Sequence, residues 1–521
     1  MRNVFNISPA RYIEFTATDL PPAPPVPRLS EAVLGRLPSG VTRPGFAPRS
    51  LSKGILHLGC GSFHRAHQAL VTQHAIDAVS DPRWGIVSVA MARPMVVDAL
   101  RSQDNLYTTL LHDDGQARVE VVGTIVEGVH APSDRLGVPS RIADPGIKIV
   151  TLTVTASGYC VSPVTGQLDL DCDQVRHDLR HPRRPVTPIG MLVYGLAEVR
   201  RRGGTPPVVL SCDNLCANGR TLRAAVIDFA ALRDGGLADW IARNVQFPNS
   251  VVDRIVQPAT PADPAAARNW LGGIEDQAPV SAEPFMTWTI EDFDGDRPRW
   301  DLAGAHFVND VTDHELAKLR LLNGTHMLLA YLGALAGYRT VAAAAADPTL
   351  GALARQFMLC EQGPTLSLPP AELRRTVDEL MIRFRNPAIC HDMTRVGRNG
   401  SDKMMPRVVA ALRDNVAAGR PTPAAALLIA AWIRWFTAAR AADAVMEVID
   451  PRANSLTPLA DVADSHLCAQ RFLQRTDIFG TLPEPDRLQR QVGDALADLT
   501  HEGVDVAVRR RLTSVLEGSA R

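Results

Sequence analysis

The residue pattern of this chain changes near position 300, and that change limits the chain to two large domains of different classes. Before it, short β-rich runs alternate with helical patterns, as in ILHLG at 55–59, VEVVGTIVEGV at 119–129 and VVLSCDN at 208–214. Such alternation is typical of a mostly parallel, doubly wound sheet. After it, alanine and leucine dominate, and helical periodicity continues to the end of the chain. A chain of 521 residues is also too long for a single core.

We therefore expect an α/β domain over residues 51–300 and a mainly α-helical domain over residues 301–521. Residues 1–50 carry the proline-rich run PPAPPVPR and little periodicity, so we expect an extended lead-in there.

The composition excludes several classes of function. A net charge of -1 leaves no basic surface for nucleic acid. The eight cysteines are scattered, and nothing completes a zinc site around Cys212 and Cys216, so we expect a reducing compartment and no metal. The N-terminal segment lacks the apolar run of a signal peptide, and the apolar stretch at 424–433 is about half a membrane span. A cytoplasmic protein without nucleic-acid or membrane partners is expected.

The stretch ILHLGCGSFHRAHQ at 55–68 is similar to a dinucleotide-binding loop in which one glycine is replaced. Gly59 and Gly61 stand where the G-x-G-x-x-G motif needs a tight turn and a close approach of the backbone to a pyrophosphate. His64 holds the third position and would keep helix and strand further apart. Backbone amides and the helix dipole suffice for phosphate binding, and Arg65 can add charge. The loop alone is also compatible with an ordinary strand-to-helix corner.

The second part of a dinucleotide site is an acidic residue at the end of the next strand, which binds the adenosine ribose. Here that strand ends in Met91-Ala92-Arg93, with no acid. Arg93 would suit a 2′-phosphate better than a free hydroxyl, so NADP stays open beside NAD. Arg93 is equally compatible with a solvated loop charge.

The stretch HELAKLRLLNGTHMLLAYLGALAGY at 314–338 predicts a leucine-rich helix with four polar side chains on one face. At 100° per residue, Glu315, Lys318, Asn323 and His326 share an arc of about 140°. One interpretation is a satisfied polar seam between domains. The other is catalytic, because a lysine shielded from water can act as a general base while an amide and an imidazole bind the reacting oxygen. Such a set would oxidise a secondary alcohol, with the hydride passing to nicotinamide.

Several motifs, in order, resemble the long-chain polyol dehydrogenases. The spacing Lys318-x4-Asn323-x2-His326 follows the G-x-G-x-F-H-R-A-H-Q loop. Further similar stretches are SCDNLCANG at 211–219, FPNSVVDRIV at 247–256, AEPFMTWTIEDF at 282–293 and GSDKM at 400–404. The resemblance covers nearly the whole chain. It implies a Rossmann-type N-terminal domain, a mainly helical C-terminal domain, an active site in the cleft between them, and a nicotinamide cofactor without zinc. A monomer or a weak homo-oligomer is expected.

The resemblance also implies roles for individual residues. Lys318 would be the general base, and Asn214 and Asn323 would donate to the alkoxide or carbonyl oxygen. His326 would position the substrate, and Glu315 would lie near the proton path from the lysine to solvent. The expected cofactor contacts, with NAD favoured, are Leu58, Gly59, Gly61, Phe63, Arg65, Arg93 and Asp253, the last of them beside both nicotinamide and substrate. The expected substrate-facing cations are Arg395 and Lys403.

One departure from the family pattern bears on the substrate. The family strand T-x-T-E-x-G-Y is TVTASGY here, so Ala156 stands where a glutamate is usual. The runs at 154–171 and 361–369 look more like the sugar-acid branch of the family, and a substrate carboxylate would pair with Arg395 or Lys403. We therefore predict a dehydrogenase that interconverts a secondary alcohol and a ketone on a six-carbon sugar acid or polyol, with D-mannonate and D-fructuronate favoured. The alternatives are the D-mannitol and D-fructose pair and, further off, a nucleotide-binding protein without catalysis.

Overall fold

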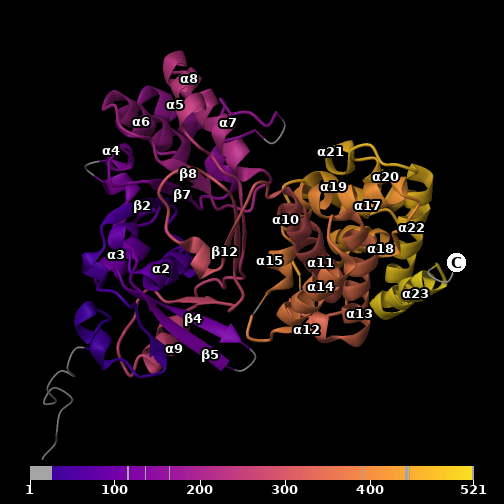
Figure 1. Cartoon of the computed structure of the whole chain (residues 1–521). Helices are drawn as coiled ribbons and strands as arrows, with labels where there is room; N and C mark the ends of the chain where they lie inside the picture. The colour runs from indigo at the N-terminus through magenta and orange to yellow at the C-terminus, as the bar shows by residue number, and fades with distance from the viewer. Residues whose placement is uncertain are drawn as a thin grey trace, which may run out of the picture.

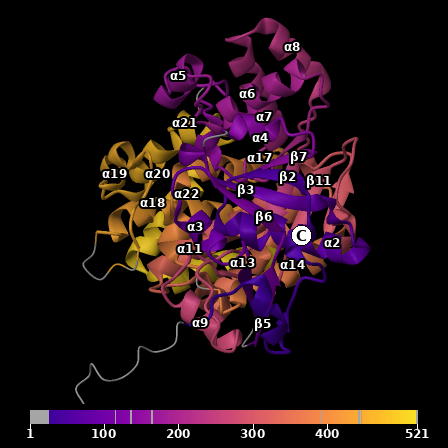
Figure 2. The ribbon, with the colours of Figure 1, turned by 90° about the vertical axis from the view of Figure 1, so that its left-hand side faces the viewer.

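A computed structural model describes residues 26–518, except 114–115, 135–136, 163–164, 390, 441–443 and 445. The chain forms two parts that lie side by side (Figure 1). One contains all the strands described, and the other, from α10 onward, is built from helices. Figure 2, seen from the side of the first part, has the central strands in front of α11 and α13. The predicted combination of an α/β part and a mainly helical part is confirmed.

A five-stranded parallel sheet forms the centre of the N-terminal part. Its strands are, in spatial order, β6 (Ile125–His130), β3 (Gly85–Ala90), β2 (Lys53–Leu58), β7 (Ile149–Leu152) and β8 (Val208–Ser211). Both faces are buried, since Ile55 packs into one core cluster and Leu56 into another. Burial on both faces explains the continuous apolar runs of these strands. The strand order reverses between β2 and β7, so a ligand crevice is expected at their carboxyl edge.

Helices cover both faces of this sheet. They are α1 (Ser62–Ala66), α2 (Gln68–Val79), α3 (Met95–Arg101), α4 (Val138–Ile142), α5 (Asp173–Arg180), α6 (Pro188–Arg201), α7 (Asn218–Ala231) and α8 (Gly235–Asn244), whereas α9 (Asp263–Trp270) packs beside β4 and β5 (Figure 1). Apolar residues of α2 and α3 pack on one face, and those of α6 and α7 pack on the other. Each crossover thus buries its apolar side against the sheet.

Two smaller sheets complete the N-terminal part. One has the order β1 (Val41–Thr42), β5 (Gln116–Val122), β4 (Tyr107–Asp113), β10 (Val280–Ala282), and the other has the order β12 (Ala305–Val308), β11 (Thr287–Glu291), β9 (Ser250–Asp253). The β-rich run at 119–129 is divided at Gly123 and Thr124, so that it supplies strands to two different sheets. In the segment expected as a lead-in, Leu29 and Val33 are buried and β1 pairs with β5. Most of the proline-rich run lies outside the described residues.

The C-terminal part is a helical bundle. Its helices are α10 (Thr312–Ala317), α11 (Thr325–Leu335), α12 (Val341–Ala346), α13 (Pro348–Gln356), α14 (Pro370–Arg385), α15 (Met393–Gly397), α16 (Gly400–Met404), α17 (Ala410–Ala417), α18 (Pro423–Ala438), α19 (Ala453–Ala460), α20 (Ser465–Leu473), α21 (Thr476–Phe479), α22 (Pro485–His501) and α23 (Gly503–Gly518). The helices α11 and α18 are buried along nearly their whole length at its centre. Among the described residues, no helix is both long and apolar enough to cross a membrane.

Three π-helical segments interrupt these helices: η7 (Lys318–Gly324), η8 (Phe357–Gln362) and η10 (Met405–Val409). η7 packs against both η8 and η10, and a Cβ added at Gly324 would lie only 2.9 Å from the carbonyl oxygen of Arg407. The single helix predicted over 314–338 is therefore α10, η7 and α11 in succession. Because π-helical hydrogen bonds join residues five apart, the prediction of 100° per residue was wrong between Lys318 and Asn323.

Candidate active site

Two cavities meet at Lys318 in the cleft between the two parts of the molecule. The first, of about 390 Å³, lies beyond the ends of β7 and β8 and is here called the strand-end cavity. The second, of about 410 Å³, lies beside the loop that follows β2 and is called the loop cavity. Both are lined by Asn214, Val252, Lys318 and Asn323. The structure therefore brings three of the five predicted catalytic residues to one junction.

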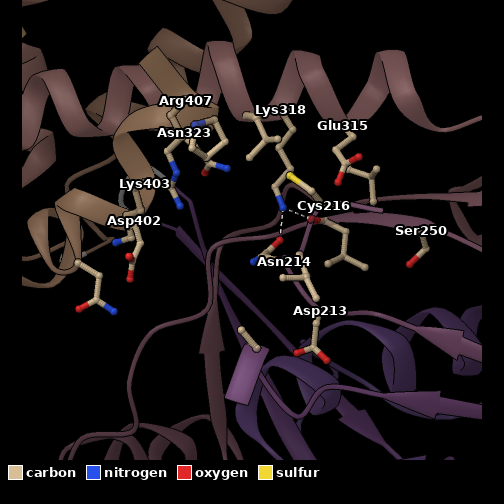
Figure 3. A pocket seen from close by; sticks show the side chains of 17 residues that line it. Asp213, Asn214, Cys216, Ser250, Glu315, Lys318, Asn323, Asp402, Lys403 and Arg407 are labelled. Atoms are coloured by element: carbon tan, nitrogen blue, oxygen red, sulfur yellow. Dashed lines mark hydrogen bonds between the residues drawn. The ribbon is translucent and has the colours of Figure 1, made fainter. Parts of the chain in front are cut away.

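Lys318 is held by contacts that suit a general base. Its Nζ donates to Oδ1 of Asn214 and to the carbonyl oxygen of Val252 (Figure 3). Burial lowers the pKa of Lys318 to about 8, while the carboxylate of Asp253 opposes this shift and Arg407 adds to it. Near neutral pH the amine can therefore both accept and release a proton.

Asn214 is placed by the loop that follows β8. Its neighbour Asp213 accepts hydrogen bonds from the backbone of Val154 at 3.0 Å and Thr155 at 2.8 Å, which ties the ends of β7 and β8 together. Because Oδ1 of Asn214 accepts from Lys318, its amide NH₂ is left to donate to a ligand. Asn323, on η7, lines both cavities.

His326, on α11, faces the loop cavity. Its ring packs edge-on against Phe384 at 4.8 Å and His391 at 5.2 Å. Burial, with His391 next in weight, holds the pKa of His326 well below its ordinary value, so the ring is neutral. Its Nε2 has no hydrogen-bond partner within the described part of the chain. An imidazole in this state can bind a substrate hydroxyl.

Glu315 lines the strand-end cavity, on the opposite side of Lys318 from Lys403 and Arg407 (Figure 3). Its carboxylate accepts from the backbone of Ala217 at 3.1 Å, and burial raises its pKa. A carboxyl group of raised pKa beside a lysine is suited to exchange protons with it.

Asp253, at the end of β9, is held by an arginine that the sequence did not single out. Arg383, on α14, donates to Oδ2 of Asp253 at 2.8 Å and to Oδ1 at 3.1 Å. The same guanidinium donates to Glu283 at 2.7 Å and lies 3.8 Å from the ring centroid of Phe285. All three ionic side chains are largely buried, so this cluster, here called the Arg383 clamp, ties the helical part to the sheet edge.

The loop after β2 keeps the geometry of a dinucleotide loop. Gly59 has a φ of +112°, and a Cβ there would lie 2.2 Å from the carbonyl oxygen of Thr153, whereas a Cβ at Gly61 would come no closer than 3.9 Å to any atom. His64 is buried and stacks on His57, with ring centroids 3.4 Å apart. Burial lowers the pKa values of both rings, so the stack is uncharged. A stacked imidazole pair thus replaces the close glycine contact between helix and strand.

Other predicted cofactor residues occupy varied environments. Leu58 is fully buried at the end of β2, and Phe63 lines the loop cavity. Arg65 is buried, donates to the carbonyl of Ala278 and lies over the ring of Tyr107, so its charge faces the interior rather than the loop surface. Arg93 is exposed just beyond β3.

The two predicted substrate cations lie in different cavities. Arg395 is exposed and lines the loop cavity, whereas Lys403 lines the strand-end cavity. Ala156 lines the strand-end cavity too, in the short turn after β7. Sequence reasoning missed Arg407, which lines the same cavity one helical turn after Lys403. Among the described residues, no three histidine, cysteine or acidic side chains gather in a way that could hold a metal ion.

Comparison with known proteins gives consistent matches over nearly the whole chain. Residues 53–302 match the model of the mannitol dehydrogenase Rossmann domain, and residues 310–500 match that of the mannitol dehydrogenase C-terminal domain. The chain is 38% identical to the D-mannonate oxidoreductase of Escherichia coli, over 79% of this chain and 85% of that protein. It is 35% identical to the mannitol 2-dehydrogenase of Cereibacter sphaeroides, over 91% of this chain and 99% of that protein.

A solved structure is similar to the same extent. The ternary complex of Pseudomonas fluorescens mannitol 2-dehydrogenase with NAD and D-mannitol matches with a TM-score of 0.83 and 35% identity, covering 93% of this chain and 99% of that one. The likeness therefore includes both parts of the molecule.

Proposed function

This chain belongs to the mannitol dehydrogenase family, and we propose that it is a nicotinamide-dependent oxidoreductase that interconverts a secondary alcohol and a ketone on a six-carbon sugar acid or polyol. The observation that carries the proposal is the environment of Lys318. A half-buried amine with a pKa of about 8 is bonded to Asn214 at the junction of two cavities, beside Asn323. No other group at this junction is so well suited to take a hydroxyl proton at neutral pH.

The residues of the loop after β2 fit a dinucleotide. A Cβ at Gly61 would meet nothing closer than 3.9 Å, so a ligand can approach the backbone there. The first turn of α1 leaves its N–H groups without carbonyl partners inside the helix, so they can bind a pyrophosphate. Ser62 and Phe63 of this loop line the cavity that reaches Lys318. When bound, the nicotinamide accepts hydride in the oxidation and returns it in the reduction. NAD is the proposed cofactor, and NADP belongs in the assay because no acid follows β3.

Each polar residue then has one task. In the oxidation, neutral Lys318 takes the proton of the substrate hydroxyl while the amides of Asn214 and Asn323 donate to its oxygen. Glu315 passes the proton from Lys318 toward solvent, and His326 binds a neighbouring hydroxyl. In the reduction, the ammonium form of Lys318 returns the proton.

The proposed substrate pair is D-mannonate and D-fructuronate. It rests on the stretches at 154–171 and 361–369 and on the relative named D-mannonate oxidoreductase. The D-mannitol and D-fructose pair is the second candidate, because relatives of similar identity are named mannitol 2-dehydrogenase.

The deciding experiment follows absorbance at the reduced-nicotinamide band with purified protein and NADH or NADPH. The ketone is D-fructuronate, D-tagaturonate or D-fructose. Oxidation of cofactor by D-fructuronate alone is the expected result, and activity on D-fructose alone would move the enzyme to the mannitol pair. Cofactor binding without turnover on any ketone would favour a nucleotide-binding protein that has lost catalysis.

A further inference from the structure

Two cations of the helical part face the strand-end cavity without a partner of opposite charge. Lys403 lies on α16, and its Nζ donates to the carbonyl of Val396 at 3.3 Å. Arg407 follows on η10. Within the part of the chain that the structure describes, neither side chain forms an ion pair, and the guanidinium of Arg407 makes no hydrogen bond.

The carboxylates of the same cavity are already engaged. Asp402 lines the cavity and is paired with Arg452. Asp213 accepts from two backbone amides and from the hydroxyl of Tyr159 at 3.0 Å. Glu315 accepts from a backbone amide and lies on the other side of Lys318 (Figure 3). The positive charge of Lys403 and Arg407 is therefore left for a ligand.

The environment of both cations makes their charge costly without an anion. Burial lowers the pKa of Lys403 to about 8, and Arg407 is the next largest influence in the same direction. Burial likewise lowers the pKa of Arg407 to about 10. Two desolvated cations that repel each other are stabilised when a single anion binds between them.

We propose that Arg407, with Lys403, binds the carboxylate of the substrate, so that this cavity selects a six-carbon sugar acid over a neutral polyol. The inference rests on the proposed function and names its substrate class. A guanidinium fork can bind both oxygens of a carboxylate, which a lone ammonium cannot do. Arg395 is less suited to this role, because it is exposed in the other cavity.

The position of Lys403 and Arg407 relative to Lys318 would fix the orientation of the bound substrate. Figure 3 shows Lys403, Arg407 and Asn323 on one side of Lys318, with Asn214 facing its amine. A sugar acid bound by its carboxylate at Arg407 would extend toward Lys318 and present an inner hydroxyl to it. The acid end would thus fix which carbon meets the base.

Calorimetric titration of the full chain tests this site without turnover. D-mannonate, D-mannitol and D-mannitol 1-phosphate are titrated separately, each in the presence of NADH and again of NADPH, because a reduced cofactor cannot take a hydride from an alcohol. The expected result is that Arg407→Gln weakens D-mannonate binding about 10- to 100-fold, the loss typical of a charge-assisted pair. D-mannitol binding should change less than about threefold. Arg407→Lys should recover part of the D-mannonate affinity, which shows that the variants are folded.

The matched control is Arg375→Gln, an exposed arginine of α14 away from both cavities. It should bind D-mannonate like the wild type. Three results would overturn the inference: unchanged D-mannonate affinity in Arg407→Gln, equal weakening of D-mannonate and D-mannitol, or no D-mannonate binding to the wild type. Tighter binding of D-mannitol 1-phosphate than of D-mannonate would mean that this site selects a phosphate group and not a carboxylate. If D-mannonate binds through Arg407 but no cofactor turnover follows, the proposed function fails while the anion site stands.

Discussion

The two walls of the cleft, the sheet edge of the N-terminal part and the helical wall of the C-terminal part, present different chemical groups. The sheet edge contributes mainly backbone: the turn at Gly59, the carbonyl of Val252 and the amides that hold Asp213. The helical wall contributes charged side chains, and two of them, Lys318 and Arg407, lie on π-helical segments. Backbone groups suit a cofactor whose phosphates are always the same, whereas side chains can change with the substrate. The comparison predicts that the sheet edge determines cofactor binding and the helical wall determines chemistry and substrate choice.

The largest effect is expected from the helical wall. Lys318→Ala removes the general base and should lower kcat by about 10²- to 10⁴-fold in both directions. Cofactor affinity, measured by quenching of protein fluorescence or by nicotinamide fluorescence, should stay within about threefold of the wild type. Steady-state rates in the alcohol-to-ketone and ketone-to-alcohol directions provide the test.

Lys148→Ala serves as the matched control, because Lys148 is exposed and its amine contacts only the carbonyl of Pro145 among the described residues. Near-wild-type kcat in Lys318→Ala would remove the lysine from the mechanism. A large loss of cofactor affinity in that variant would contradict the prediction that the sheet edge determines cofactor binding.

The next effect concerns the Arg383 clamp, which joins the walls. Arg383→Gln leaves the buried carboxylates of Asp253 and Glu283 without their cation, so the free energy of unfolding should fall by about 3–5 kcal/mol. Urea denaturation followed by circular dichroism measures this change. Arg355→Gln breaks the half-exposed pair with Asp378 and should cost less than about 1 kcal/mol. Equal losses in the two variants would mean that the clamp adds no stability beyond a surface pair.

The clamp also marks the limit of what the sequence could predict. The glycine loop and the Lys318-x4-Asn323-x2-His326 spacing are local patterns. Their residues are close together in the sequence and lie within one turn or one helical segment. Arg383 and Asp253 are 130 positions apart, so no spacing connects them, and an arginine among several on α14 looks like a surface charge.

The π-helical segments were beyond prediction for another reason. The spacing of apolar residues distinguishes an α-helix, with 3.6 residues per turn, from a β-strand, with a period of two. A single wider turn within a long apolar helix leaves that spacing almost unchanged. The wider turn at η7 depends on packing against η8 and η10, with Gly324 admitting the carbonyl of Arg407. The sequence therefore placed Lys318 and Asn323 on one helical segment but gave the wrong angle between them. Arg65 is a similar case, since its place directly after His64 suggested added charge for phosphate binding, whereas its side chain packs inward.

A pair of glycine variants tests the sheet edge. Gly59→Ala places a Cβ at positive φ and against the carbonyl of Thr153, so it should destabilise the fold by at least about 1–3 kcal/mol. Gly61→Ala adds a Cβ in ordinary contact, 3.9 Å from the carbonyl oxygen of Gly59, and should change stability by less than about 0.5 kcal/mol while weakening cofactor binding. Thermal unfolding with and without NAD separates the two effects. Unchanged cofactor affinity in Gly61→Ala would contradict a backbone-bound pyrophosphate.

The smallest effect expected is on the pH dependence, where the two walls act together on Lys318. Its pKa of about 8 means that the neutral amine is the minor form below pH 8. Oxidation needs the neutral amine, so kcat/KM for the oxidation should rise about tenfold per pH unit below pH 8 and level off above it. Reduction needs the ammonium form, so kcat/KM for the reduction should fall above pH 8. Initial rates between about pH 6 and 10 in both directions measure this midpoint.

Arg383→Gln sharpens the same measurement. It removes a cation that lowers the pKa of Lys318 and leaves the carboxylate of Asp253, which raises that pKa, without its counter-ion. Both influences point the same way, so both pH profiles should move to higher pH, whereas Arg355→Gln should leave them in place. A wild-type midpoint at the ordinary lysine value of 10.5 would mean that the cleft does not desolvate the amine. If the midpoint lies near 8 in both the wild type and Arg383→Gln, burial alone lowers the pKa of Lys318. The helical wall would then act on this base only by excluding water.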